Sequence, residues 1–183
     1  LKAADVREAL SRIAVPGDIF MTQYECEQNT VLASLEYAKE IGMYTIFNPA
    51  PAKIIPEKYY PFIDLLVVNQ TEAEYQTGIF PQEEESCKQA IESMQRMGAK
   101  QVIITLGSRG SIFNAGESLH SVPAERVEVV DTTAAGDTFI GVLAACLAEG
   151  KEIEESVRYA TKAAALTIMR YGAQQAIPYR DEV

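Results

Sequence analysis

The sequence predicts an α/β fold with a mostly parallel sheet in a three-layer α/β/α arrangement. Apolar runs of strand length alternate with segments whose apolar residues recur at helical spacing, along most of the 183 residues. The strand candidates are continuously apolar, which is typical of a parallel sheet covered by helices on both faces. Because strands and helices alternate, right-handed crossovers are expected between neighbouring strands.

The first part of the chain is expected to supply the parallel strands. They are predicted as buried segments at residues 18–21, 43–47, 63–68 and 102–106. Helical spacing covers 31–38 and 90–97, and the acidic run 83–85 fits the N-terminal turn of the latter helix, where the dipole favours carboxylates. A short helix after the third strand is predicted to begin with Thr71 as N-cap and Glu74 as its capping-box partner, and to end at Gly78.

The last third is predicted to be a hairpin followed by two helices. Residues 111–114 and 118–122 form the hairpin, which turns at Ala115–Gly116. One apolar stripe covers residues 139–147 and stops at Gly150, and a second covers 153–168. His120, the only histidine, falls in a hairpin strand and is interpreted as structural or solvated.

Composition excludes several classes of protein. The chain has 26 acidic and 16 basic residues, a formal net charge of -10, which disfavours nucleic acid or an anionic membrane as a partner. No apolar run approaches the roughly 20 residues of a membrane span. The odd number of cysteines, without metal-site spacing, indicates free thiols in a reducing compartment and hence a cytoplasmic protein. A Ser-His-Asp hydrolase is set aside because no G-x-S-x-G elbow accompanies the single histidine.

The segment 130–138 is the strongest candidate for chemistry. It follows a β-like stretch, contains Asp131-Thr132-Thr133-Ala134-Ala135-Gly136-Asp137, and opens an apolar helix. Small residues allow a ligand close to the backbone, and free amides at a helix start favour anionic oxygen. Asp137 then stands where a hydroxyl attacking a phosphoryl group would lose its proton. The alternative is an ordinary helix start with an acidic first turn.

Two further segments accompany that turn. Thr105-Leu106-Gly107-Ser108-Arg109-Gly110 lies between two strands and could bend the backbone around a nucleotide, or be a plain strand connection. Asn69 and Glu72 follow the third strand, at the edge where open α/β sheets bind ligands. Glu74 has a predicted structural role as the capping-box partner, whereas Glu72 has none that is evident. This difference favours a role for Glu72 in binding a metal ion or water. No Walker A sequence and no G-x-G-x-x-G fingerprint is present, which disfavours a dinucleotide oxidoreductase.

Together these residues resemble the ribokinase-like family of carbohydrate kinases. Residues 131–137 resemble its D-T-x-x-A-G-D signature, 69–72 its N-x-x-E motif, and 105–110 its nucleotide-binding T-x-G-x-x-G segment. Residues 48–52 (Asn-Pro-Ala-Pro-Ala) and 172–174 (Gly-Ala-Gln) are similar to the ribose-phosphorylating members. The resemblance implies transfer of the γ-phosphoryl group of ATP to the 5-hydroxyl of ribose. It leaves open another sugar or nucleoside kinase (fructokinase-, deoxyribokinase- or adenosine kinase-like) or a nucleotide-binding pseudokinase.

The resemblance also implies a role for each matching residue. Asp137 would be the general base and contact the sugar, and the amides of Ala134, Ala135 and Gly136 would form the anion hole. Glu25 would contact the sugar, and Glu72 would organise Mg²⁺ through water. The ATP site would comprise Asn69, Thr105, Gly107, Ser108, Arg109, Gly110, Gly136 and Thr161. A K⁺ site would comprise Asp131, Thr133, Thr167, Arg170, Gly172 and Ala176.

The sequence departs from the family pattern in three respects. Thr161 stands where many relatives have His beside the adenine, and Ala176 where a hydroxyl-bearing residue is common. The family's N-terminal segment, with its Gly-Gly sugar motif and the lid through which members form homodimers, does not occur in these residues. Residues 1–183 are therefore interpreted as the C-terminal portion of a single kinase domain. The full-length protein is expected to bind ATP and a small sugar, and residues 1–183 alone are expected to be inactive.

Overall fold

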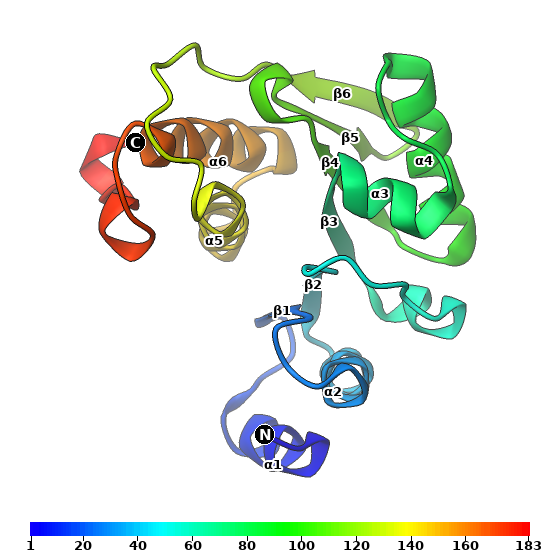
Figure 1. Cartoon of the computed structure of the whole chain (residues 1–183). Helices are drawn as coiled ribbons and strands as arrows, with labels where there is room; N and C mark the ends of the chain where they lie inside the picture. The colour runs from blue at the N-terminus through cyan, green and yellow to red at the C-terminus, as the bar shows by residue number, and fades with distance from the viewer. The chain divides into compact units, whose positions relative to one another are not determined.

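A four-stranded parallel sheet lies at the centre of the first of two units in the computed structural model, which describes residues 1–183 (Figure 1). The units are residues 1–105 and 106–183. The strands of the first unit stand side by side in chain order: β1 (Ile19–Gln23), β2 (Tyr44–Asn48), β3 (Leu65–Asn69) and β4 (Gln101–Thr105). All neighbours pair in parallel, so the carboxyl ends of the strands meet at one edge.

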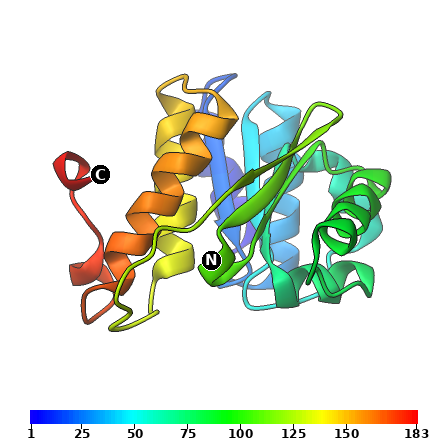
Figure 2. The same ribbon diagram turned by 90° about the horizontal axis from the view of Figure 1, so that it is seen from above.

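The helices that connect these strands pack against one side of the first unit's sheet. They are α2 (Gln28–Glu40), α3 (Gln70–Thr77) and α4 (Glu84–Met97), with the 3₁₀ segment η1 (Glu57–Phe62). Figure 2 shows them together on the same side of the strands. Sequential strand order with right-handed crossovers requires this arrangement. The predicted alternation of strands and helices is thus confirmed.

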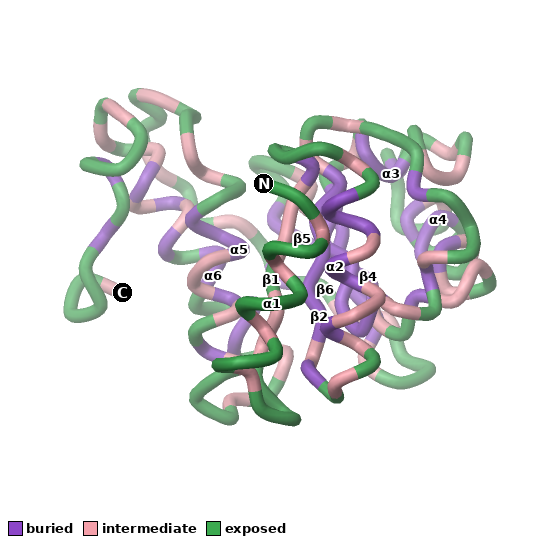
Figure 3. The backbone as a smooth tube through the Cα atoms, turned by 90° about the horizontal axis from the view of Figure 1, so that it is seen from below, coloured by how far each residue is buried: buried purple, intermediate pink, exposed green.

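One helix of this unit was not expected from the sequence. The segment α1 (Ala3–Ile13) precedes β1 and buries none of its residues, so it is mostly green in Figure 3. The prediction that the first strand is buried is also wrong in degree. No residue of β1 is fully buried, and Met21 is 46% exposed, whereas β2, β3 and β4 are buried over most of their length. Within the unit β1 pairs with β2 alone, and it therefore has less cover.

A buried carboxylate, Asp64, cross-links the chain at the amino-terminal end of the same sheet. Asp64, just before β3, accepts hydrogen bonds from Lys39 at 2.6 Å and from the Thr45 amide at 3.0 Å, and pairs with Lys100 at 2.8 Å. Burial alone would raise the pKa of Asp64, but the bonds from Lys100, Lys39 and Thr45 hold that pKa below its usual value. Asp64 therefore ties α2, β2 and β4 together as a structural element.

The second unit contains the predicted hairpin and the predicted helix pair. The hairpin consists of β5 (Ser111–Ala115) and β6 (Ser118–Val122), and the helices are α5 (Ala135–Ala148) and α6 (Ile153–Ile168). The helices lie side by side in Figure 2, and the fully buried Ala160 and Ala163 permit close packing. Short 3₁₀ turns occur at η2 (Gly107–Arg109), η3 (Gln174–Ala176) and η4 (Arg180–Glu182). None of the helices has the length and apolar character needed to cross a bilayer.

The predicted start of α3 is wrong. Asn69, not Thr71, is the N-cap: its side chain accepts a hydrogen bond from the Glu72 amide at 2.8 Å, and Glu72 Oε2 accepts one from the Asn69 amide at 2.9 Å. Glu74 is exposed and takes no part in this capping box. Gly78 ends the helix in the left-handed region, as predicted. Glu72 therefore has a structural role that the sequence interpretation denied it.

Candidate active site

The turn before α5 presents main-chain donors at a helix N-terminus. Ala134 has φ 62° and ψ 7°, and it is the one residue other than glycine with a positive φ. No side chain caps α5, and the Gly136 amide has no acceptor in the chain, while the Ala135 amide makes a long bond of 3.3 Å to the Thr132 carbonyl. A strained alanine beside an uncapped helix start is the kind of geometry that binds an anion.

Asp137 lies in the first turn of α5 and its side chain is exposed. At this position a carboxylate is favoured by the helix dipole and is open to a ligand. The neighbouring Thr138 is buried, and its hydroxyl is hydrogen-bonded to the Thr167 hydroxyl of α6 at 3.1 Å. The packing of α5 on α6 thus fixes the helix that carries Asp137.

Asp131, Thr133 and Gly172 come together at the C-terminal end of α6. The Thr133 amide donates to Asp131 Oδ1 at 2.9 Å, and the Gly172 amide donates to Oδ2 at 3.2 Å. The amides of Val130 and Asp131 both donate to the Ile168 carbonyl, at 2.7 and 3.1 Å. Hydrogen bonding from Thr133, and then from Gly172, lowers the pKa of Asp131. The carboxylate is therefore favoured in its charged form, between the Thr133 and Gly172 amides.

The other residues matched to the cation site use their side chains elsewhere. The fully buried Thr167 hydroxyl donates its proton to the Ala163 carbonyl at 3.0 Å. Arg170 forms an ion pair with Glu182. Ala176 is fully buried, and its amide donates to the Ala173 carbonyl at 3.1 Å. Main-chain oxygens are therefore the ligands that Thr167, Arg170 and Ala176 could offer to an ion.

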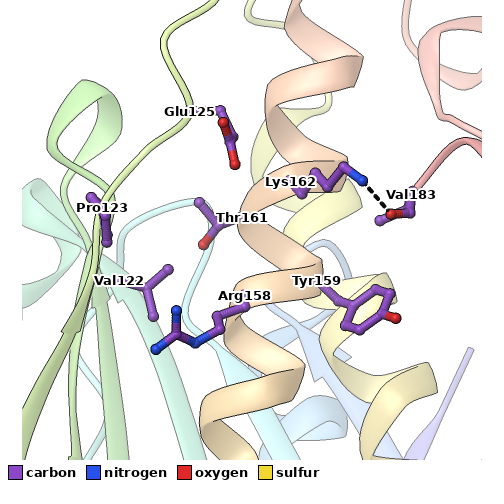
Figure 4. Close-up of a pocket in the computed structure, with 8 residues that line it drawn as sticks. All are labelled: Val122, Pro123, Glu125, Arg158, Tyr159, Thr161, Lys162 and Val183. Atoms are coloured by element: carbon purple, nitrogen blue, oxygen red, sulfur yellow. Dashed lines mark hydrogen bonds between the residues drawn. The ribbon is translucent and has the colours of Figure 1, made fainter.

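A cavity of about 370 Å³ opens between the end of β6 and one face of α6. One wall comes from the chain that leaves β6 (Val122, Pro123, Glu125), the other from α6 (Arg158, Tyr159, Thr161, Lys162), with Val183 at the edge. Figure 4 shows the Thr161 side chain projecting from α6 toward the β6 side. The volume falls in the usual range for small-molecule sites.

The hydroxyl group of Thr161 is buried without a hydrogen-bond partner. The residue is 8% exposed, yet Oγ1 is buried and has no hydrogen-bond partner. Buried polar groups are almost always paired, so an orphan hydroxyl on a cavity wall indicates a ligand that supplies the partner. Arg158 and Lys162, which line the same cavity, were missed from the sequence although their i, i+3, i+4 spacing with Thr161 puts them on one helix face.

The glycine-rich turn 107–110 supports the wall of this cavity. Gly110 has φ +92°, and a Cβ there would lie 1.9 Å from the Val122 carbonyl oxygen. Only glycine lets the two segments pass at this distance, so Gly110 sets the position of Val122 and Pro123. Gly107, Ser108 and Arg109 form the exposed turn itself. The nucleotide-binding role of this turn remains a prediction, whereas its part in building the cavity follows from the packing.

Asn69, Glu72 and Thr105 gather at the carboxyl edge of the first unit's sheet. Asn69 and Thr105 are register partners on β3 and β4, and the Thr105 hydroxyl donates to the Val68 carbonyl at 3.4 Å. Glu72 is 5% exposed, and burial raises its pKa despite hydrogen bonds from Asn69 and Asn48. Glu25 is exposed in the turn after β1. Polar side chains therefore lie at the carboxyl ends of β3 and β4, where the sequence predicted them.

The donor set at this edge suits one kind of metal site. No group of three or more acidic, histidine or cysteine side chains is placed to hold an ion directly. Glu72 is instead a single buried carboxylate with one oxygen, Oε2, engaged by the protein. Mg²⁺ often keeps several waters and is held by one or two carboxylates together with substrate phosphates. Glu72 fits that mode, in which the nucleotide supplies the remaining ligands.

Comparison with known proteins gives a consistent family. Residues 9–180 match the family described as pfkB family carbohydrate kinase. Ribokinase of Staphylococcus aureus is 36% identical over 170 residues, which are 92% of this chain and 56% of that protein. The crystal structure of ribokinase from Thermotoga maritima has a TM-score of 0.81 and 37% identity, and the match covers 96% of this chain and 57% of that one.

A solved relative also contains ligands. The structure of Arabidopsis thaliana ribokinase complexed with ribose and ATP has a TM-score of 0.86 at 32% identity, with the match covering 98% of this chain and 56% of that one. The chain thus spans somewhat more than half the length of the ribokinases it matches. These likenesses confirm the predicted ribokinase-like α/β fold.

Proposed function

Because the chain belongs to the pfkB family of carbohydrate kinases, we propose that the native protein containing it transfers the γ-phosphoryl group of ATP to the 5-hydroxyl of ribose. The observation that carries the proposal is the turn 131–137. It combines a strained Ala134, a Gly136 amide without an acceptor and an exposed Asp137 in the first turn of α5. Those are the parts that phosphoryl transfer to an alcohol requires.

In the proposed reaction Asp137 is the general base. It accepts the proton of the attacking hydroxyl as a new bond forms between the sugar oxygen and the γ-phosphorus and the bond to the β-phosphate oxygen breaks. The products are ADP and the sugar phosphate. The amides of Ala134, Ala135 and Gly136 and the α5 dipole stabilise charge on the transferring oxygens. No protein side chain needs to form a covalent intermediate.

The ATP and sugar contacts are assigned from the cavity geometry together with the family resemblance. The cavity lined by Thr161 accepts the adenine, and the orphan hydroxyl supplies a hydrogen bond to it. The turn 107–110 flanks the adenosine, Asn69 contacts the phosphates, and Thr105 lies beside it. Glu72 would hold Mg²⁺ through water, and that ion supplies charge neutralisation of the phosphates when bound. Glu25 contacts the sugar.

The cluster around Asp131 is the proposed monovalent-cation site. The lowered pKa of Asp131 keeps a negative charge beside the Thr133 and Gly172 amides. The family resemblance implies that main-chain oxygens within residues 167–176 complete the K⁺ site. Small-molecule sugar and ATP are the proposed partners, in a cytoplasmic enzyme that forms homodimers as the family resemblance implies. The buried Ala176 offers no hydroxyl, so the site depends on carbonyl groups.

The proposal is tested by ADP release with a panel of acceptors. The native protein that contains these residues is incubated with MgATP and KCl together with ribose, 2-deoxyribose, fructose or adenosine, and ADP is measured by a coupled assay. Ribose is expected to give the highest kcat/KM. A higher value with fructose or adenosine would contradict the substrate assignment, and ADP release that no acceptor accelerates would contradict the kinase activity.

A further inference from the structure

A chain of hydrogen bonds, half-buried at Gln23 and buried at Asn48 and Glu72, runs across the carboxyl ends of three strands in the first unit. Gln23 at the end of β1 donates from Nε2 to Asn48 Oδ1 at 2.9 Å. Asn48, at the end of β2, donates from Nδ2 to Glu72 Oε2 at 3.0 Å and to the Val67 carbonyl at 2.9 Å. Asn48 and Glu72 are each 5% exposed. No function assigned so far uses Asn48 or Gln23.

The bonding pattern fixes which way the Asn48 amide points. Its oxygen faces a donor, the Gln23 amide nitrogen, and its nitrogen faces two acceptors, Glu72 and the Val67 carbonyl. Turning the amide over would set oxygen against both acceptors, which buried groups do not tolerate. The Asn48 amide therefore has one orientation, in which its nitrogen donates to Glu72.

Both hydrogen bonds to the Glu72 carboxylate reach the same oxygen. Oε2 accepts from Asn48 and from the Asn69 amide, at 3.0 and 2.9 Å. Of these two bonds, a capping box at the start of α3 requires only the one from the Asn69 amide to Glu72, so the bond from Asn48 is additional. The second bond, from Asn48, restricts rotation of the carboxylate about its last side-chain bond. Oε1 is thereby held in one direction.

We propose that Asn48 is a positioning residue for the metal: it fixes Glu72 so that Oε1 is directed at the water shell of nucleotide-bound Mg²⁺. The orientation of the Asn48 amide is set by its two acceptors, Glu72 and the Val67 carbonyl, and Gln23 presents a donor that matches it. The inference rests on the proposed kinase function and deepens it. Partners of direct metal ligands typically change metal affinity about 10- to 100-fold when they are removed; because Glu72 reaches the ion through water, we expect an effect near the lower end of that range.

The test measures metal binding directly. The affinity of the protein–ADP complex for Mn²⁺, used as a paramagnetic probe for Mg²⁺, is measured by electron paramagnetic resonance. The affinity for ADP without metal is measured by calorimetry, and stability by thermal denaturation. The variants are Asn48→Leu, which removes both N–H donors and keeps the branching of the side chain, and Gln23→Glu, whose carboxylate attracts the Asn48 amide nitrogen and turns the amide over.

Two control variants separate positioning from stability. Thr45→Val removes a buried hydroxyl that donates to the Phe62 carbonyl at 2.6 Å, at the opposite end of β2. Gln23→Leu removes the bond to Asn48 Oδ1 but leaves both acceptors of the Asn48 nitrogen in place. Thr45→Val should lower the melting temperature without changing Mn²⁺ affinity, and Gln23→Leu should bind Mn²⁺ nearly as the wild type does.

Asn48→Leu and Gln23→Glu are each expected to weaken Mn²⁺ binding about tenfold and to leave metal-free ADP affinity within about twofold. If wild type binds Mn²⁺ and both variants bind it equally well, the positioning role is overturned and the kinase proposal stands. If the wild-type ADP complex itself does not bind Mn²⁺, the role of Glu72 falls and the inference with it. Equal loss in Gln23→Leu and Gln23→Glu would overturn the argument from amide orientation.

Discussion

Replacing Thr161 by valine should stabilise the free protein and weaken its binding of nucleotide. Valine has the shape of threonine without the hydroxyl, and Thr161 Oγ1 is buried with no partner. An unsatisfied buried hydroxyl costs about 1–3 kcal/mol. Because 8% of the residue remains exposed to the cavity, we take the lower end, about 1 kcal/mol. That corresponds to a rise in melting temperature of roughly 2–4 °C.

The same substitution removes a hydrogen bond to the ligand. A neutral hydrogen bond contributes about 0.5–1.5 kcal/mol, so ADP should bind roughly two- to thirteenfold more weakly. Thr167→Val is the matched stability control on α6, since that hydroxyl bonds to Thr138 and to the Ala163 carbonyl. It should lower the melting temperature instead of raising it.

Thermal denaturation and calorimetric titration with ADP decide the matter. A Thr161→Val protein that melts below the wild type and binds ADP with unchanged affinity would refute the reasoning. That result would mean that the hydroxyl has a structural partner and that the cavity does not hold the base. Opposite signs for Thr161→Val and Thr167→Val would support it, because only the unpaired hydroxyl should be costly in the free protein.

Three further predictions follow from the structure. Asp64→Ala should lower the free energy of unfolding by about 3 kcal/mol at neutral pH, whereas Lys100→Met, at a position whose side chain is 62% exposed, should cost less than about 1 kcal/mol. Because the pKa of Asp64 is lowered in the folded state, its contribution is present above about pH 4 and is lost as the pH falls through the folded pKa, so urea unfolding of wild type and Asp64→Ala should converge in acid. Gly110→Ala would place a methyl group 1.9 Å from the Val122 carbonyl at a positive φ; we expect a loss of about 2–4 kcal/mol and weaker ADP binding, and a melting temperature equal to the wild type would contradict this packing. Replacing K⁺ by tetramethylammonium should reduce ribose-dependent ADP release, and equal rates in the two salts would argue against the cation site.

The sequence predicted the strands because their signal is local. Residues of β2, β3 and β4 are continuously apolar and are buried over most of their length, so periodicity alone identifies them. The helix α1 was missed although Val6, Leu10 and Ile13 recur at helical spacing, and none of its residues is buried. The helix start within residues 131–137 was predicted correctly, because the signal for it lies in one continuous segment; the chemistry assigned to that segment stays a prediction.

Other features depend on tertiary packing that a linear pattern does not contain. Both Asn69 with Glu72 and Thr71 with Glu74 fit a capping box, and the choice depends on where β3 ends; the strand continues to Asn69. The cavity needs Val122 and Thr161 to face each other, although they are distant in sequence. The hydrogen bonds of Asn48 likewise join strand ends that only the sheet register brings together.

The central claim, that Asp137 is the general base of an ATP-dependent ribose kinase, is tested most directly by single-turnover phosphorylation of ribose with the Asp137→Asn variant. The account predicts ADP affinity close to that of the wild type and a rate of phosphoryl transfer reduced about 10²- to 10⁴-fold, the usual contribution of a positioned acid–base group. A variant that binds ADP normally and retains more than half of the wild-type rate would contradict it.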